Sequence, residues 1–347
     1  EKADKTNLLS LEIGTFYANK GLSNSEIASL SRSQHQSQGF GSTGTRGSET
    51  EYLEFLKGDF PVNKNVFDGI DTTWNRVEGG KELYTILQNV ENKYDFKNPS
   101  VSIPELVEAY QLISKLKDEH WRTIKSKEIK KIIAACAGLY LEAAANNSST
   151  TSNSKNTIKI EAINRSKFNI SLKSVSINPL NITEEKSLHL AQNSPQLFSI
   201  NVTIPSEINN TYPYWLSEKG SLGMYKVSDK NLISLPETPR AIFANFILDF
   251  NGITIPFSKE VVYKYNDPVK GEVYQPFEIL PQVSASFNEK VYIFSEDNSQ
   301  KISIKVKAVK DSLQGKISLC IPESWKVLPE NHTFSLFQKG EEQSFEF

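Results

Sequence analysis

The spacing of apolar residues changes once along the chain, and this change restricts the fold more than any other feature. Between residues 80 and 145 apolar side chains recur every three or four positions, as at Leu83, Ile86 and Val90, which predicts amphipathic helices. From Ile158 onward apolar and polar residues alternate, which predicts half-buried strands. The order of the two patterns predicts a multidomain α+β protein in which helices precede β-sandwiches.

Turn and cap signals place individual elements. Asn251-Gly252 between two alternating runs predicts a β-hairpin. Residues 7–17 alternate in the way of a strand. A serine followed three residues later by a glutamate forms a capping box, which predicts helix starts at Ser23 with Glu26, Ser48 with Glu51 and Ser102 with Glu105.

Two stretches without an apolar pattern suggest domain boundaries. Residues 146–156 are polar and low in complexity, which is typical of a solvated linker, and Asp267 to Pro281 is interpreted as a second linker. The expected division is a strand and helix over 1–47, a helical domain over 48–145, the linker over 146–156, a β-sandwich over 157–267 and a second, truncated immunoglobulin-like β-sandwich over 268–347.

Composition argues against several classes of function. The chain carries 39 basic and 41 acidic residues without a basic cluster, which argues against a nucleic-acid surface. No apolar run reaches membrane-spanning length, so no transmembrane segment is expected. Cys136 and Cys320 fall in elements predicted for different domains, which makes a disulfide scaffold improbable. The four histidines lack metal-ligand spacing, so no metal site and no cofactor are expected within this chain.

Residues 4–47 resemble a known family. The runs DKTNLLSLEIGTFY and KGLSNSEIASLSRSQHQSQGFGSTGTRGS are similar to the distal part of PIG-L (LmbE-like) zinc-dependent N-acetylglucosamine deacetylases, in their long, secreted, multidomain Bacteroidetes type. Likeness continues through EYLEFLKGDFP, FDGIDTTWNRVEGG, DEHW and PYWLSEKGSLGMY. The His-Pro-Asp-Asp-Glu metal motif of that family and its later paired histidines are absent from the chain.

The resemblance implies a function for the chain as a whole. It implies a strand-helix remnant of an α/β deacetylase domain, a partner deacetylase domain upstream that holds the zinc, and a periplasmic or secreted location. The chain itself is then a non-catalytic C-terminal region. Two other hypotheses stay open: an accessory module that binds a glycan, a glycoconjugate or a protein, and a structural spacer.

The resemblance also suggests substrate-binding residues. The segment HQSQ, from His35 to Gln38, matches an H-x-S-Q pattern that the family carries near its pocket, which implies proximity to substrate rather than zinc ligation. Arg46 follows in the glycine-rich loop, where its planar donor group suits sugar hydroxyls or phosphate. An equally weighted alternative is that these polar residues cap the end of a helix. The G-x-G-x-x-G spacing from Gly39 to Gly44 follows a helix rather than a strand, which argues against a nucleotide site.

Two further segments have a binding interpretation and a structural one. Trp74 is a candidate for stacking on a sugar, although packing between helices is favoured. The acids around it, Asp68, Asp71 and Glu78, are interpreted as turn and cap formers rather than as a glycosidase pair. In the run TYPYWL, the aromatic residues Tyr212, Tyr214 and Trp215 suit a sugar platform, but packing in a sandwich core or between domains is favoured.

Overall fold

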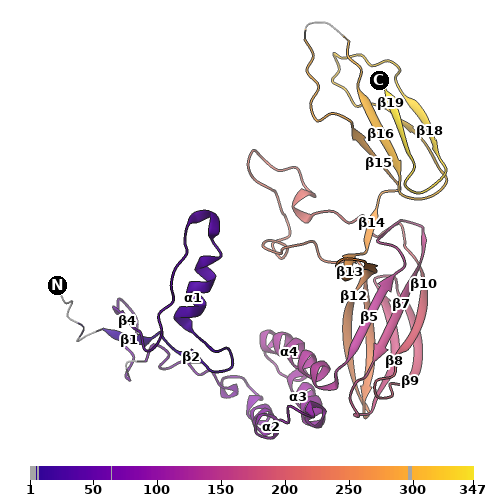
Figure 1. Cartoon of the computed structure of the whole chain (residues 1–347). Coiled ribbons are helices and arrows are strands. Elements are labelled where there is room, and N and C mark those ends of the chain that lie inside the picture. The colour runs from indigo at the N-terminus through magenta and orange to yellow at the C-terminus, as the bar shows by residue number, and fades with distance from the viewer. Residues whose placement is uncertain (1–4, 6–7, 64, 296–298) are drawn as a thin grey trace. The chain divides into compact units, whose positions relative to one another are not determined.

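The computed structural model describes residues 5, 8–63, 65–295 and 299–347. The chain divides into two compact units, residues 1–81 and 82–347. Strands outnumber helices among the described residues of this mixed fold, and the longer helices α2, α3 and α4 directly precede the large sheet (Figure 1). This confirms the α+β class that the change of apolar spacing predicts.

The first unit contains one helix and two small antiparallel ladders among its described residues. The capping box is present as predicted: Glu26 N donates to Ser23 Oγ over 3.2 Å, and Ser23 N donates to Glu26 Oε2 over 3.0 Å. Strand β1 pairs with β4, and β2 pairs with β3. The elements are β1 (Leu9–Glu12), β2 (Phe16–Tyr17), β3 (Leu22–Ser23), α1 (Asn24–Ser33), the 3-10 turn η1 (Gln36–Gln38), β4 (Thr50–Leu53) and the 3-10 turn η2 (Trp74–Arg76).

The helix predicted after Ser48 is wrong. Thr50–Leu53 is strand β4, in register with β1 so that Leu9 faces Leu53 and Glu12 faces Thr50. The Glu12 carboxylate accepts a hydrogen bond from Glu49 N over 2.8 Å, which fixes the start of the strand. Pairing with a strand distant in sequence has overridden the local cap signal, because propensity is only a weak preference.

Few apolar side chains are buried in the first unit. Within its described residues, only Leu9 and Val77 are buried among the hydrophobic residues, and α1 has no buried residue at all. Phe16 is 62% exposed and Leu56 is 85% exposed. The other large apolar or aromatic side chains exposed in this unit are Tyr17, Leu30, Phe40, Tyr52, Leu53, Phe60, Val62, Phe67 and Ile70.

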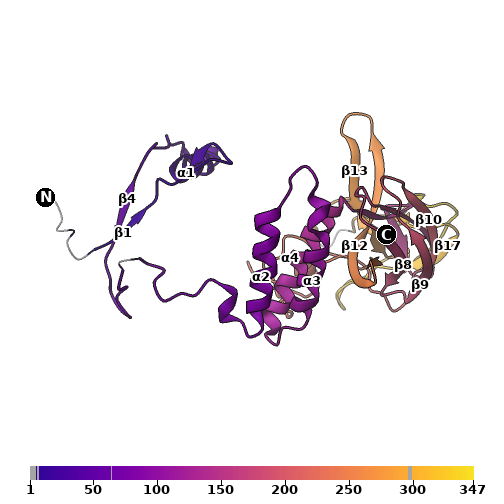
Figure 2. The same ribbon diagram turned by 90° about the horizontal axis from the view of Figure 1, so that it is seen from below.

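Three helices open the second unit and pack side by side (Figure 2). The Asp118 carboxylate accepts a hydrogen bond from Trp121 N over 3.1 Å and caps the start of the last helix. The helix ends before Gly138, whose backbone has the left-handed conformation. The helices are α2 (Gly80–Lys93), α3 (Ile103–Ser114), which follows the 3-10 turn η3 (Pro99–Ser102), and α4 (Glu119–Ala137). Their buried apolar face includes Leu83, Ile103, Leu106, Val107, Ile113, Leu116, Ile129 and Ile133.

Two expectations about these helices need correction. Ser102 stands at the start of α3, but its side chain makes no capping hydrogen bond, since the backbone there is already helical after η3. The helix expected to run to Ala145 ends at Ala137, and Tyr140–Ala145 is strand β5. The alanines of this strand suit a sheet interior as well as a helix, and its partners β7 and β12 decide the outcome.

An eight-stranded sheet forms the main core of the second unit. The first half of β12 pairs with β11 and its second half pairs with β5 and β13, so one strand joins two parts of the sheet. Strand β11 buries every second residue, which places Phe246 and Phe250 in the core. The strands are β5 (Tyr140–Ala145), β7 (Lys155–Ile163), β8 (Ile170–Asn178), β9 (Ile182–His189), β10 (Gln196–Thr203), β11 (Phe243–Phe250), β12 (Ile253–Asp267) and β13 (Gly271–Pro276).

The hairpin predicted at Asn251-Gly252 is confirmed. It joins β11 to β12, and both residues have positive φ, 52° and 95° respectively, as a type I′ turn requires. Gly252 N donates to the Asp249 side chain over 3.0 Å, which tightens the turn.

Both predicted linkers contain paired strands. Within 146–156, strand β6 (Ser149–Thr151) buries Thr150 and Thr151 and pairs with β14 (Glu278–Leu280). Asn156 Nδ2 donates to Thr150 Oγ1 over 2.7 Å, so the polar side chains satisfy one another instead of water. Within the second stretch, β13 pairs with β12 and β14 pairs with β6. Residues 268–280 therefore belong with the strands that precede them, and not with the C-terminal strands. A polar sequence predicted exposure here, but paired hydroxyls and amides can be buried.

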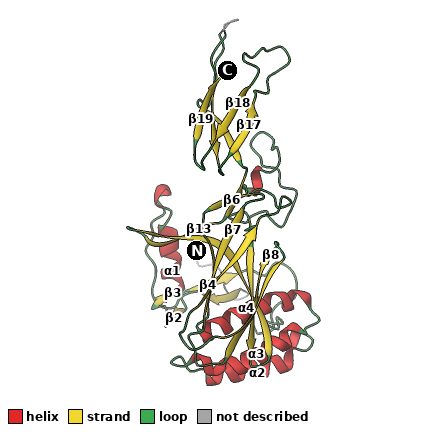
Figure 3. Ribbon diagram, turned by 90° about the vertical axis from the view of Figure 1, so that its right-hand side faces the viewer, coloured by secondary structure: helices red, strands yellow, loops and turns green. Residues whose placement is uncertain are grey.

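The C-terminal strands enclose a separate small core (Figure 3). Strands β15, β16 and β19 form one antiparallel sheet, and β17 pairs with β18. The buried residues include Ile304, Val306, Phe334, Leu336 and Phe345. The strands are β15 (Val283–Phe287), β16 (Ser303–Ala308), β17 (Leu313–Ile317), β18 (His332–Leu336) and β19 (Glu342–Glu346).

Candidate functional site

His35 and Gln38 lie just beyond the end of α1. His35 precedes the turn η1, and Gln38 N donates to His35 O over 3.1 Å. Both side chains are exposed. The His35 ring lies 6.2 Å from the Phe40 ring, and the Arg32 guanidinium lies 5.4 Å from the same ring. The arrangement offers an imidazole, an aromatic face and a cation at one end of the helix.

Arg46 lies at the other end of α1. Its Nε is 2.9 Å from Glu26 Oε1, with the arginine side chain 75% exposed and the glutamate 17% exposed. The pKa of Glu26 is lowered, first by the hydrogen bond from the Ser23 backbone and also by Arg46. Glu26 lies seven helical positions before Ser33, the last residue of α1, which is about 10 Å at 1.5 Å per residue, and His35 follows two residues later. The described residues therefore bring His35 and Gln38 together, but not with Arg46.

The glycine-rich loop between them lies along α1. Ser42 N donates to Ser33 Oγ over 3.3 Å, Ser29 Oγ donates to Ser42 O, and Ser23 Oγ donates to Thr45 O over 3.3 Å. A Cβ on Gly44 would lie 2.7 Å from Glu26 Cα, so the loop can approach this closely only with glycine at that position. The serines of α1 thus fix the loop that carries Arg46.

Trp74 and its neighbouring acids form turns. Trp74 is half-buried and begins η2, whose cap is Thr73. The Asp71 carboxylate accepts hydrogen bonds from Thr73 N over 2.8 Å and Thr73 Oγ1 over 2.7 Å, and Asp68 accepts one from Asn63 N over 2.7 Å. These contacts agree with the interpretation of both acids as turn formers. A substrate-binding role for Trp74 stays a prediction.

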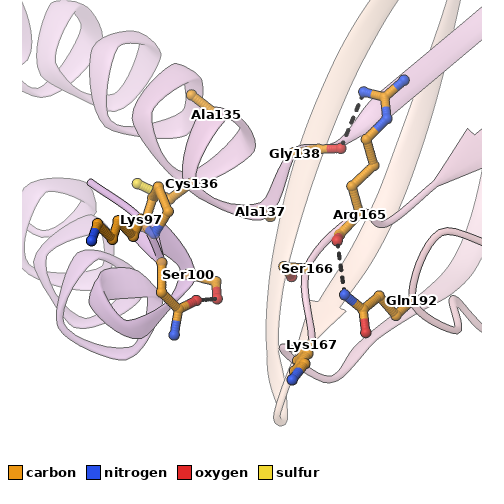
Figure 4. A pocket seen from close by; sticks show the side chains of 12 residues that line it. Lys97, Ser100, Ala135, Cys136, Ala137, Gly138, Arg165, Ser166, Lys167 and Gln192 are labelled. Atoms are coloured by element: carbon orange, nitrogen blue, oxygen red, sulfur yellow. Dashed lines mark hydrogen bonds between the residues drawn. The ribbon is translucent and has the colours of Figure 1, made fainter. Parts of the chain in front are cut away.

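A basic cavity of about 480 Å³ lies at the end of α4 (Figure 4). Lys97 and Cys136 line its helical side, and Arg165 and Lys167 line the other side. Arg165 Nη1 donates to Gly138 O over 3.4 Å, which orients the guanidinium away from the centre. Burial raises the pKa of the Cys136 thiol, which keeps it protonated and poorly nucleophilic. The described residues that line the cavity include no carboxylate or imidazole, so they offer no proton acceptor for acid-base chemistry.

A titratable cluster centres on Glu142 in β5. Its carboxylate lies 2.6 Å from Lys264 Nζ and accepts hydrogen bonds from the Tyr140 and Tyr274 hydroxyls, the latter over 2.9 Å. Burial opposes ionisation of Glu142, but these partners outweigh it and lower its pKa; the pKa values of Lys264 and Tyr274 are raised. Because each polar group has a partner, the cluster is structural. Sequence reasoning missed it, since the four residues are scattered over three strands.

The aromatic run from Tyr212 to Trp215 lies outside the sandwich core, which corrects one of the two favoured kinds of packing; packing between domains stays a prediction. It lies in the long connection between β10 and β11, where Tyr212 is 49% exposed and Trp215 is half-buried. The Tyr214 and Trp215 rings meet edge to face, 5.0 Å apart. Trp215 lines two cavities, of about 370 and 430 Å³. Sequence analysis identified these residues as binding candidates but could not show that they remain accessible to solvent.

Metal-binding groups and membrane-spanning helices are both absent from the part of the chain that the structure describes. Within residues 5, 8–63, 65–295 and 299–347 there is no group of three or more His, Cys, Asp or Glu side chains that could hold a metal ion. Cys136 and Cys320 are both free thiols. None of the helices in these ranges is long and apolar enough to cross a membrane.

Comparisons with known proteins give no family. No family model matches the chain, and neither does any curated protein. Among solved structures, red sea bream transglutaminase is similar at 9% identity and a TM-score of 0.29, over 67% of this chain and 31% of that chain. Pseudomonas fluorescens alkylpurine DNA glycosylase AlkC, bound to DNA containing an abasic site analog, is similar at 8% identity and a TM-score of 0.18, over 50% of this chain and 51% of that chain. The chain thus spans about a third of the transglutaminase, and TM-scores this low do not establish a shared fold.

Proposed function

We propose that this chain is the non-catalytic C-terminal region of a PIG-L-like, zinc-dependent N-acetylglucosamine deacetylase that acts in the periplasm or outside the cell. In this proposal residues 8–81 form one edge of the deacetylase domain, and the zinc is held by a part of that domain with the His-Pro-Asp-Asp-Glu motif. In this proposal the chain's own contribution is to shape the enzyme and to bind its substrate rather than to hydrolyse it.

The observation that supports the proposal is that the first unit leaves large apolar side chains exposed on its surface. Phe16 in β2, Leu30 in α1 and Leu56 after β4 are all more than half exposed. Monomeric proteins seldom leave so many large apolar side chains in water within so short a segment. Covering each of them stabilises the assembly by about 1.5–3 kcal/mol. A second domain that packs on this unit would supply that cover.

The same proposal gives roles to the polar residues of this unit. Glu26 and the serines of α1 hold Arg46 and its loop in place, while the exposed guanidinium stays open to a ligand. His35 and Gln38 present their side chains at the opposite end of the helix. Against a deacetylase domain, the two positions would border a substrate channel at separate points.

The β regions are proposed to be immunoglobulin-like modules attached to that enzyme. Antiparallel ladders with alternating burial, as in β11 and β16, support this assignment. The joint use of β12 by two parts of the large sheet is a departure from a simple two-sheet arrangement.

The gene provides a direct test. The reading frame ahead of Glu1 is expected to encode the His-Pro-Asp-Asp-Glu motif and the later paired histidines. A reading frame that lacks both would contradict the proposal.

Activity of the longer protein provides a second test. We expect it to release acetate from chitotetraose, and we expect Arg46→Ala to lower kcat/KM while the nearby Lys20→Ala, at an exposed turn, leaves it unchanged. Equal effects of the two substitutions would remove Arg46 from the substrate channel.

A further inference from the structure

The connection from Ile204 to Ile242, between β10 and β11, is long for a loop with one short 3-10 turn, η4 (Tyr214–Leu216). Loops of this length without secondary structure of their own are uncommon in compact domains, where they are usually either functional or linker segments. The loop belongs to the second unit, so a role for it does not depend on the role proposed for the first unit.

Hydrogen bonds fix the base of this loop. Thr211 N donates to Ile279 O over 2.7 Å, and Ile279 N donates back to Thr211 Oγ1 over 3.1 Å. Tyr214 N donates to Thr238 Oγ1 over 2.9 Å, and Thr238 Oγ1 donates to Tyr212 O over 2.9 Å. The two ends of the loop are thereby tied to each other and to β14, which holds the aromatic run in one conformation. A binding surface that is ordered before its ligand arrives loses less entropy on binding.

Trp215 is shared by the two cavities that this loop forms. Tyr212, Arg240 and Glu278 line the first cavity with it, and Glu218, Met224 and Tyr225 line the second. Both volumes fall in the range of small-ligand sites. Each cavity therefore has an indole or phenol ring together with at least one carboxylate.

The polar groups of both cavities are held by ion pairs. Arg240 Nη2 lies 2.5 Å from Glu237 Oε2, and Lys226 Nζ lies 2.9 Å from Glu218 Oε2. The Glu218 pKa is lowered by the Ser228 hydrogen bond first and by Lys226 next, so this carboxylate is an acceptor at neutral pH. Oriented donors and acceptors beside aromatic rings are suited to a ligand with apolar C–H faces and many hydroxyls.

We propose that the loop is a binding site for an oligosaccharide of pyranose units, with one unit in each cavity and Trp215 between them. The C–H face of a sugar ring packs on the indole, and its hydroxyls hydrogen-bond to Arg240 in one cavity and to Glu218 in the other. Binding involves no covalent step and needs no cofactor.

Calorimetric titration of the whole chain with chitotetraose and with cellotetraose tests this site. We expect at least one of the two tetrasaccharides to bind, Trp215→Ala to weaken binding at least tenfold, and Trp215→Phe to retain part of it because a ring remains. Trp325→Ala is the control, because Trp325 is a solvent-accessible tryptophan, 46% exposed, that lies in the C-terminal β region; this variant should bind as the unsubstituted chain does. Circular dichroism and thermal unfolding check that each variant is folded.

Three outcomes would overturn the proposal. The first is no binding of either tetrasaccharide by the unsubstituted chain at millimolar concentration. The second is equal loss of binding in Trp215→Ala and Trp325→Ala. The third is self-association in sedimentation that Trp215→Ala abolishes, which would make the loop an interface between two copies of the chain.

Discussion

The two strands β1 and β11 both carry apolar side chains but have very different surroundings. Strand β11 pairs on both sides, with β8 and β12, and buries four of its residues. Strand β1 pairs only with β4 among the described residues and buries Leu9 alone. Strand β11 lies in a well-packed core, whereas the apolar residues of β1 belong to a unit that has almost no core. An apolar pattern therefore indicates that a strand needs a surface to pack against, but it does not show whether this chain provides that surface.

The largest effect that separates the two regions is expected from truncating a buried aromatic residue. Phe246→Ala removes a fully buried ring and should lower the free energy of unfolding of the large sheet by about 3–5 kcal/mol. Leu56→Ala, at an exposed site of the first unit, should change it by less than about 0.5 kcal/mol. Urea unfolding followed by circular dichroism measures both. Similar losses for the two variants would mean that Leu56 belongs to a core.

A smaller effect is expected from the Glu142 cluster, which has no counterpart among the described residues of the first unit. Glu142→Gln should cost about 2 kcal/mol, because it removes the charge that Lys264 and two tyrosine hydroxyls contact. Glu184→Gln, which breaks a 3.6 Å contact with Lys186 at a more exposed position, should cost less than about 1 kcal/mol. Urea unfolding of the two variants checks this order.

The loss of stability caused by Glu142→Gln should depend on pH in a direction that follows from the pKa shifts. The pKa of Glu142 is lowered in the folded state, so its stabilisation is present above the unfolded-state pKa and is lost as the pH falls through the folded-state pKa. The pKa of Lys264 is raised, so its share is complete below its unfolded-state pKa and is lost as the pH rises through the folded-state pKa. The difference in unfolding free energy between the unsubstituted chain and Glu142→Gln should therefore shrink in acid. A constant difference down to low pH would contradict the ionised cluster.

Substituting one glycine in each region tests how strongly the backbone is constrained there. Gly252→Ala places a side chain at a φ of 95° in the β11–β12 hairpin and should cost about 1–2 kcal/mol. Gly41→Ala, in the loop along α1, meets no atom within 4 Å and has no positive φ, so it should have almost no effect. Thermal unfolding decides between them, and a Gly41→Ala loss as large as that of Gly252→Ala would show a tighter loop than described.

The smallest effect is expected at the exposed ion pair of the first unit. Arg46→Ala should change stability by less than about 1 kcal/mol, because the guanidinium is mostly in water. Glu26→Ala should cost more than Arg46→Ala, since it also removes half of the capping box. Hydrogen exchange of the α1 amides reports both changes. The reverse order would mean that Arg46 has a larger structural role than this single contact.

Local signals predicted those elements whose partners are close in sequence. The Ser23–Glu26 capping box and the Asn251-Gly252 hairpin follow from a few adjacent residues, and both are present. The signals failed where a distant strand decides the outcome. Residues 50–53 pair with β1, and residues 140–145 pair with β7 and β12, so neither segment is a helix.

The site residues show the same limit. Sequence reasoning named Tyr212 and Trp215 but favoured their burial, because exposure depends on the course of the whole β10–β11 loop. It could not foresee that Glu26, in the first turn of α1, would hold Arg46, whereas His35 follows the last turn of the same helix. The Glu142 cluster was missed entirely, since its members come together only through the register of β5, β12 and β13.

Hydrogen exchange of β1 and β11 in the same chain tests the central claim most directly, namely that the first unit lacks a core of its own. Amides in β11 should open only with global unfolding, whereas the β1 amides bonded to β4 should exchange at least about a thousand times faster through local opening. If the proposed upstream domain covers the first unit, protection of β1 in a protein that includes this domain should rise toward that of β11. Protection of β1 as strong as that of β11 in this chain alone would contradict the claim, and the need for a partner domain would fall with it.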